Sequence, residues 1–285
     1  SRVPIPKTAP MTWQGIEGHD TVAEHFRQSI LNGRMGNTFL FVGPQGIGKR
    51  TFAIKLAQSL LCEQFSSTAD APLQPCGVCS SCVQVLAGSH PDLDVIERPA
   101  DKKFIPIDLL IGDKAHRMRE GLCARIAMRP SCGSRKIAII DDADYLNIEG
   151  ANSLLKTLEE PPAGSLLILI STSAQRQLPT IRSRAQVVRF APLSNEVCEK
   201  LLLTHGLAAD ADAAQRSARL GSGSLAMAVA WSDPGLDEFR RGLYHALREP
   251  DWSSQSLAKS VAEFVDAVGK EAPKRRARLH QVIQM

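Results

Sequence analysis

The sequence lacks any long hydrophobic run, and aromatic residues make up only 5% of it. No segment approaches the ~18 consecutive apolar residues of a membrane-spanning helix, and the first ten residues contain no apolar stretch of the kind found in secretory signals. With two tyrosines and three tryptophans, the chain has little material for stacking on nucleic-acid bases. We therefore expect a cytoplasmic protein that contacts no membrane.

A strong charge of either sign is also missing. The net charge is +4, with 22% charged and 44% hydrophobic residues, which is typical of a globular protein. This balance permits contact with nucleic acid without requiring it. The 285 residues predict two or three domains. The chain opens at Ser1 without methionine, and its C-terminal part is short, so we expect processing or truncation.

Cysteine is present in an odd number, seven, which favours a reducing compartment over a disulfide framework. Three cysteines follow the spacing C-x₂-C-x₂-C (Cys76, Cys79 and Cys82), and Cys62 lies upstream. Four thiolates form a closed tetrahedral Zn²⁺ site, so the segment 62–90 predicts a zinc module. Buried free thiols and a redox pair are the alternatives. Cys123, Cys132 and Cys198 are expected to be small core residues.

A glycine-rich loop joins a predicted strand, 38–42, to a predicted helix, 51–61. Strand, loop and helix in this order form the context in which backbone amides hold phosphate. The pattern G-x-x-x-x-G-K-[ST] fails at its last position, because Arg50 replaces the hydroxyl that would hold Mg²⁺. Thr51 comes one residue late and points about 100° away on a helix. The candidate nucleotide-binding residues of this loop are Gly43, Gly46, Gly48, Lys49, Arg50 and Thr51.

Asp141 and Asp142 follow a second predicted strand, 136–140. Asp141 is suited to support Mg²⁺. Asp142 stands where ATPases with a glycine-rich phosphate loop place a glutamate that polarises the attacking water. A side chain shorter by one methylene displaces the carboxylate, and a shift of ~1 Å can lower the rate about 10²-fold. With the altered loop, these residues indicate a decayed nucleotide site, occupied or empty. A ligand-free turn with exposed carboxylates is the alternative.

The remaining pattern alternates strands and helices. Further strands are expected at 166–170 and 186–190, and helices at 20–33, with Asp20 as N-cap, at 108–129 and at 152–160. This alternation predicts an α/β fold with a parallel sheet covered on both faces. After Phe190 only helical patterns remain. Two arginines, Arg182 and Arg184, precede the last strand, and spacing alone favours solvated surface charges there.

Three segments resemble the AAA+ clamp-loader subunits of bacterial DNA polymerase III. They are the helix Ala151–Pro162 (ANSLLKTLEEPP), the Ser183-Arg184-Ala185 segment, which resembles a Ser-Arg-Cys motif, and the four-cysteine module. The resemblance covers roughly residues 11–232. It implies a P-loop AAA+ domain (1–190) with an inserted zinc module (62–90), a helical lid (191–232) and an incomplete helical collar (233–285).

Departures from the family pattern indicate the delta-prime type. An active motor would have Ser or Thr at 50, Glu at 142 and an arginine in the stretch Gly223-Ser224-Leu225-Ala226. The resemblance then implies a stator with little or no ATPase activity of its own, whose Arg184 acts in trans on a neighbour's ATP. Ser173, or Thr172, would occupy the sensor position.

The implied partners are the delta and gamma/tau subunits, the β sliding clamp and primed DNA. Zn²⁺ is the implied cofactor, whereas ATP with Mg²⁺ is doubtful in the chain's own site. Two rival functions remain: an active gamma/tau-like clamp-loader ATPase, and a stand-alone zinc nucleic-acid-binding protein.

Overall fold

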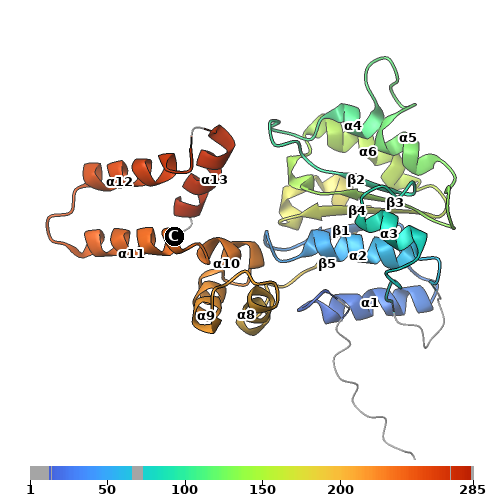
Figure 1. Ribbon diagram of the computed structural model, residues 1–285. Helices are drawn as coiled ribbons and strands as arrows, with labels where there is room; N and C mark the ends of the chain where they lie inside the picture. Colours follow the sequence, from blue (N-terminus) through green and yellow to red (C-terminus); the bar gives the residue numbers. More distant parts are fainter. Residues whose placement is uncertain (1–12, 14, 66–72, 270, 284–285) are drawn as a thin grey trace, which may run out of the picture. The chain divides into compact units, whose positions relative to one another are not determined.

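A computed structural model describes residues 13, 15–65, 73–269 and 271–283 of the chain. The chain divides into two compact units, with the boundary between Pro192 and Leu193 (Figure 1). The predicted leader at residues 1–10 lies outside the described residues. The finer division into lid and collar near residue 232 stays a prediction. Among the described residues, no helix has the length and apolar content needed to cross a membrane.

The first unit is built on a five-stranded parallel sheet with the strand order β2-β3-β4-β1-β5. The expected α/β class is therefore confirmed. β1 lies in the interior of the sheet, and its register with β4 pairs Val42 with Ser171. Because all strands run in parallel, their carboxyl ends meet at one edge, where the phosphate loop begins. The strands are β1 (Thr38–Val42), β2 (Leu93–Ile96), β3 (Lys136–Ile140), β4 (Ser165–Ser171) and β5 (Gln186–Arg189).

Helices cover both faces of this sheet (Figure 1). On one face, Phe39 and Phe41 of β1 pack with Phe26 and Phe52 in an aromatic cluster. On the other face, the alternate β1 residue Leu40 joins an aliphatic core. The helices of this unit are α1 (Asp20–Leu31), α2 (Lys49–Leu61), α3 (Ser80–Leu86), α4 (Ile107–Ile111), α5 (Gly121–Ala127), α6 (Ile148–Glu159) and α7 (Pro179–Arg182), with 3₁₀ turns at Ala143–Tyr145 and Ala174–Arg176.

Some local expectations were wrong. The single helix expected at 108–129 is two short helices, α4 and α5, because Gly112 and Gly121 adopt φ values of 82° and 83°. A Cβ at Gly121 would lie 2.5 Å from the backbone nitrogen of Gly112, so the chain folds back tightly there. His19, rather than Asp20, is the N-cap of α1. The short elements β2, α3 and α7 were not expected.

The second unit is entirely helical in its described part. Its helices are α8 (Asn195–Thr204), α9 (Ala211–Leu220), α10 (Leu225–Trp231), α11 (Pro234–Arg248), α12 (Ser254–Asp266) and α13 (Ala272–Ile283). Side chains of Ser194, Asp210 and Ser224 cap the first three of these helices. The stacked rings of Phe239 and Phe264, with centroids 4.1 Å apart, join α11 to α12.

The basic run on α13 is largely paired within the second unit. Lys274 pairs with Glu271, Arg275 with Asp266, and Arg278 Nη1 lies 2.8 Å from Asp233 Oδ2. Arg278 also lies over the ring of Phe264. These charges therefore hold the helices of this unit together, which reduces the charge that the run offers to nucleic acid.

Candidate functional site

The glycine loop lies between β1 and α2, as its sequence predicted. A side chain at Gly43 would place a Cβ 2.5 Å from the carbonyl oxygen of Phe190, and Gly48 adopts a φ of 95° as the N-cap of α2. His19 contacts the loop, because its Nε2 lies 2.7 Å from the carbonyl oxygen of Ile47. The loop thus keeps the backbone conformation that only glycine tolerates.

Lys49 turns back onto this loop. Its Nζ donates to the carbonyl oxygens of Gly43 and Pro44, at 2.6 and 2.5 Å. Burial lowers the pKa of Lys49, although the nearby charges of Asp141, Asp144 and Asp142 act in the opposite direction. The lysine therefore lies near the acidic residues after β3, and its ammonium is held by the carbonyl oxygens of the loop.

Arg50 binds the carboxylates that would otherwise support a metal ion. Its Nη1 donates to Asp141 Oδ2 at 3.0 Å and to a carboxylate oxygen of Glu97, which follows β2. The hydrogen bond that Arg50 donates to Glu97 and the charge of Asp141 raise the pKa of Arg50, against the effect of burial. A guanidinium therefore lies between the carboxylates that follow β2 and β3. Thr51 is exposed.

Asp142 differs from its neighbour Asp141. It has a left-handed backbone conformation, with φ 55°, and its amide donates to Asp141 Oδ1 at 2.9 Å. Burial and the adjacent charge of Asp141 raise the pKa of Asp142. The two adjacent carboxylates therefore differ in their surroundings, and that of Asp142 forms less readily than that of an exposed aspartate.

Asp144 is a third carboxylate at this edge of the sheet, and no sequence motif singled it out. Its side chain is 4% exposed. It accepts hydrogen bonds from the hydroxyl of Ser171, and from the amide and hydroxyl of Thr172 at 2.9 and 2.5 Å. Burial alone would raise its pKa, but these hydrogen bonds lower it. Asp144 thus ties the turn after β3 to the end of β4.

The two residues proposed for the sensor position lie at the end of β4. Thr172 uses its hydroxyl to bind Asp144. The carbonyl oxygen of Ser173 accepts a hydrogen bond of 2.7 Å from Ser171. Thr172 therefore connects directly with the acidic edge of the site, whereas Ser173 contributes its backbone.

Arg184 lies just after α7, away from the phosphate loop in sequence. Its Nη2 lies 2.7 Å from Glu159 Oε1, at the end of α6. Its Nη1 donates to the carbonyl oxygen of Thr180 at 2.9 Å and to Ser183 Oγ at 3.1 Å. One third of the side chain is exposed. The guanidinium is thus held at the surface in a defined orientation, and Glu159 is a second residue that sequence reasoning missed.

The four predicted zinc ligands come together around α3. All four Sγ atoms of Cys62, Cys76, Cys79 and Cys82 lie within 4.8 Å of one another. The Cys62–Cys79 and Cys76–Cys82 sulfur pairs are 3.9 and 4.0 Å apart. A tetrahedral site with Zn–S bonds of about 2.3 Å requires sulfur atoms about 3.8 Å apart, so the cluster fits zinc.

The backbone around the cysteine cluster favours thiolates. Amides of Cys76, Cys79 and Cys82 donate to the sulfurs of Cys62, Cys76 and Cys79 at 3.3 to 3.4 Å. Amide hydrogen bonds from Val78 and Cys79 lower the pKa of Cys76 to about 7, whereas burial raises the pKa of Cys82. Of the other cysteines, Cys123 and Cys198 are buried as expected, but Cys132 is exposed.

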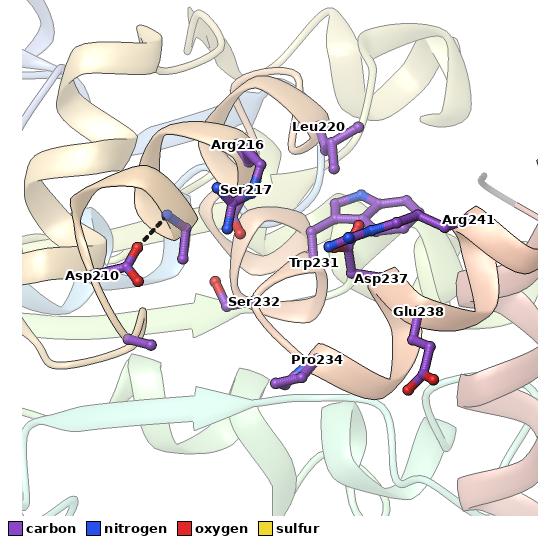
Figure 2. Close-up of a pocket in the computed structure, with 12 residues that line it drawn as sticks. Asp210, Arg216, Ser217, Leu220, Trp231, Ser232, Pro234, Asp237, Glu238 and Arg241 are labelled. Carbon is purple, nitrogen blue, oxygen red and sulfur yellow. Dashed lines mark hydrogen bonds and ion pairs between the residues drawn. The ribbon is translucent and has the colours of Figure 1, made fainter.

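A separate pocket of about 470 Å³ lies in the second unit, between α9 and α11 (Figure 2). Trp231 forms part of its wall, beside Asp237 and Arg241. Asp237 pairs with both Arg240 and Arg241, and the two arginines lower its pKa. The charges of Asp237 and Arg241 at the pocket are therefore paired within α11.

Comparison with known proteins gives a consistent result. A sequence model of the family described as "DNA polymerase III, delta subunit" matches residues 18–194. DNA polymerase III subunit delta' of Pseudomonas aeruginosa is 33% identical over 243 residues, which cover 84% of this chain and 69% of that protein. DNA polymerase III subunit gamma/tau of Mycobacterium tuberculosis is 32% identical over 196 residues, which cover 69% of this chain and 31% of that protein.

Among solved structures, the Aeropyrum pernix ORC1 protein in complex with DNA aligns with 92% of this chain and 68% of that protein, at 16% sequence identity and a TM-score of 0.50. At this identity the likeness concerns the fold alone. It agrees with the parallel sheet and phosphate loop described above.

Proposed function

The chain belongs to the family of DNA polymerase III delta subunits, and from that premise we propose that it is a delta-prime-like stator of a bacterial clamp loader. In this proposal it assembles with delta and gamma/tau subunits. The assembly loads the β sliding clamp on primed DNA. The stator contributes an arginine to the ATP of a neighbouring motor subunit and hydrolyses little or no ATP itself.

The observation that carries the proposal is the position of Arg50. Its guanidinium binds Asp141 and Glu97, on the side of the loop where Mg²⁺ would have to bind. Phosphoryl transfer depends on a metal ion that neutralises charge on the β- and γ-phosphates. The single positive charge of Arg50 is already paired with two carboxylates, so it does not neutralise the phosphates as a metal ion would. The shorter side chain of Asp142 is a further loss, since it withdraws the carboxylate from the position that a glutamate would reach.

Arg184 is the residue that we assign to the neighbour's site. The guanidinium carries a permanent charge and a planar fork of donors, which suits the equatorial oxygens of a transferring phosphoryl group. Its position after α7, with one third of the side chain exposed, leaves it accessible to another subunit. An arginine supplied in trans can raise the rate of phosphoryl transfer by about 10³–10⁵.

Zinc has a structural part in this proposal. Cys62, Cys76, Cys79 and Cys82 would hold the ion, and with four protein ligands no position stays open for water or substrate. When bound, zinc would cross-link the end of α2 to the residues before and within α3. The cysteines then fix the start of α3 against the end of α2, whose residue Gln58 donates to the carbonyl oxygen of Cys82 at 3.2 Å.

Substitution of Arg184 by alanine tests the proposal. In a complex reconstituted from this chain, delta and gamma/tau, we expect Arg184→Ala to lower the DNA-stimulated ATPase rate at least 10²-fold, with assembly unchanged in gel filtration. Arg182→Ala, which removes an arginine from α7 itself, is the matched control and should change the rate less than twofold. An ATPase rate that is unchanged by Arg184→Ala would refute the assignment.

A gamma/tau-like motor is the second candidate, and the similarity to the mycobacterial gamma/tau subunit favours it. This function requires the chain's own loop to work. ATP turnover by the purified chain alone, abolished by Lys49→Ala, would support the motor and exclude the stator. The stator predicts the same low background turnover in both proteins.

A further inference from the structure

Arg184 is fixed by acceptors from two helices before any neighbour is present. Glu159 Oε1 lies 2.7 Å from its Nη2, and the carbonyl oxygen of Thr180 and the hydroxyl of Ser183 accept from its Nη1 at 2.9 and 3.1 Å. Ser183 Oγ is itself bound to the carbonyl of Thr180 at 3.1 Å. Thr180 and Ser183 belong to the same short segment as Arg184. Glu159 alone comes from a different element.

Glu159 stands in an electrostatically unfavourable place. It is the last residue of α6, where the carbonyl ends of the helix carry partial negative charge, and acidic side chains are disfavoured there. The ion pair with Arg184 compensates for that repulsion. Glu160, the next residue, is also exposed at this helix end but is not the carboxylate that Arg184 binds.

The helix that carries Glu159 is firmly held. Asn147 Oδ1 accepts from the amide of Gly150 at 2.7 Å and caps its first turn. Leu154 and Leu158 are buried in the aliphatic core, at 0% and 4% exposure. Glu159 follows Leu158 directly, so its carboxylate projects from a fixed backbone. A group on a rigid element positions its partner more accurately than a group on a loop.

We propose that Glu159 is a positioning residue for Arg184, holding the guanidinium in the orientation in which it meets the neighbour's nucleotide phosphate. The inference rests on the proposed stator function. A free arginine side chain has to lose much rotational freedom when it binds a phosphate. Because Glu159, Thr180 and Ser183 already restrict Arg184, less freedom is lost at the step where the neighbour's phosphoryl group is transferred.

The test uses the reconstituted complex with Glu159→Ala, Glu159→Gln and Glu159→Asp. We expect Glu159→Ala to lower the DNA-stimulated kcat about tenfold without changing the KM for ATP, because the neighbour's own loop binds the nucleotide. Glu159→Gln keeps an acceptor without charge and should fall between Glu159→Ala and the native protein. Glu159→Asp keeps the charge and should restore part of the loss. Glu160→Gln is the matched control and should leave kcat unchanged.

A second arm separates positioning from a structural defect. If Glu159 acts through Arg184, then Glu159→Ala lowers kcat no further in a chain that already carries Arg184→Ala. An equal fall in both backgrounds, or a kcat that Glu159→Ala leaves unchanged or raises, overturns the inference. In those cases the proposed function still stands if Arg184→Ala abolishes stimulation. If Arg184→Ala has no effect, the proposed function fails first.

Discussion

Two regions of the first unit have the layout of a divalent cation site, and they differ in what occupies the centre. At the cysteine cluster, four sulfurs lie within 4.8 Å of one another. At the phosphate loop, Asp141 and Glu97 converge in a similar way, but Arg50 binds both. The first arrangement has the geometry to hold a metal ion, whereas in the second a guanidinium is paired with the carboxylates.

The comparison shows that ligand residues alone do not define a metal site. Asp141 follows its strand at the position where the sequence predicted a Mg²⁺-supporting aspartate, but in the structure its carboxylate is paired with Arg50. A buried carboxylate requires a compensating charge or hydrogen bonds, and either a metal ion or an arginine can provide it. The same reasoning applies to Asp144, which is satisfied by hydroxyl and amide donors and by an ion pair of 3.7 Å with Arg176.

The largest effect should come from the cysteine cluster. We expect the native chain to contain about one zinc per molecule, measured by atomic absorption, and Cys79→Ser to lose it. Because the metal cross-links a segment with few apolar residues, its loss should lower the Tm of the first unit by ~10 °C. Cys132→Ser, at an exposed cysteine outside the cluster, should retain both zinc and Tm. A zinc-free native protein would contradict the metal assignment.

Asp144→Asn should have the next largest effect, a loss of about 2 kcal/mol in the free energy of unfolding, because the buried hydroxyl and amide donors lose a charged acceptor. Since its pKa is lowered in the folded state, Asp144 stabilises the fold above the ordinary aspartate pKa of ~3.9, and this stabilisation is lost as the pH falls below that value. Denaturant titrations at pH 7 and pH 3 measure both quantities.

Asp142→Asn provides the control for Asp144→Asn. The pKa of Asp142 is raised, so its carboxylate opposes folding as the pH rises through the ordinary range. At pH 7 Asp142→Asn should therefore be neutral or slightly stabilising. If Asp142→Asn lowered the free energy of unfolding as much as Asp144→Asn does, both carboxylates would be stabilised by their neighbours in the fold.

The smallest effect concerns Arg50. Arg50→Thr restores the hydroxyl and frees Asp141, so the isolated chain should bind ATP about tenfold more tightly with Mg²⁺ than with EDTA, a difference of ~1.4 kcal/mol. Turnover should stay low because Asp142 remains. Thr51→Ala, which removes an exposed hydroxyl, should leave affinity unchanged. Isothermal titration calorimetry measures these affinities. If the native chain bound ATP as tightly with Mg²⁺ as Arg50→Thr does, Arg50 would not exclude the metal ion. The contrast between the phosphate loop and the cysteine cluster would then fail.

Much of the fold could be predicted, because its strongest signals are local. The apolar runs at β1, β3 and β4 are buried throughout, as expected of central strands in a parallel sheet. Short or irregular elements escaped prediction. β2 has only four residues, and α4 and α5 are separated by a turn whose glycines looked like interruptions of one helix.

The sequence by itself determined the glycine loop, the cysteine spacing and the arginine before β5, since each depends on residues that are close along the chain. Only the tertiary structure decided which charges meet. Glu97 and Asp141 lie 47 and 91 residues from Arg50, and Glu159 lies 25 residues before Arg184. The pairs of Arg50 form because parallel strands bring distant carboxyl ends to one edge of the sheet. Glu159 and Arg184 instead precede β4 and β5, and they meet because α6 packs against α7. No periodicity in the chain records which of these ends become neighbours.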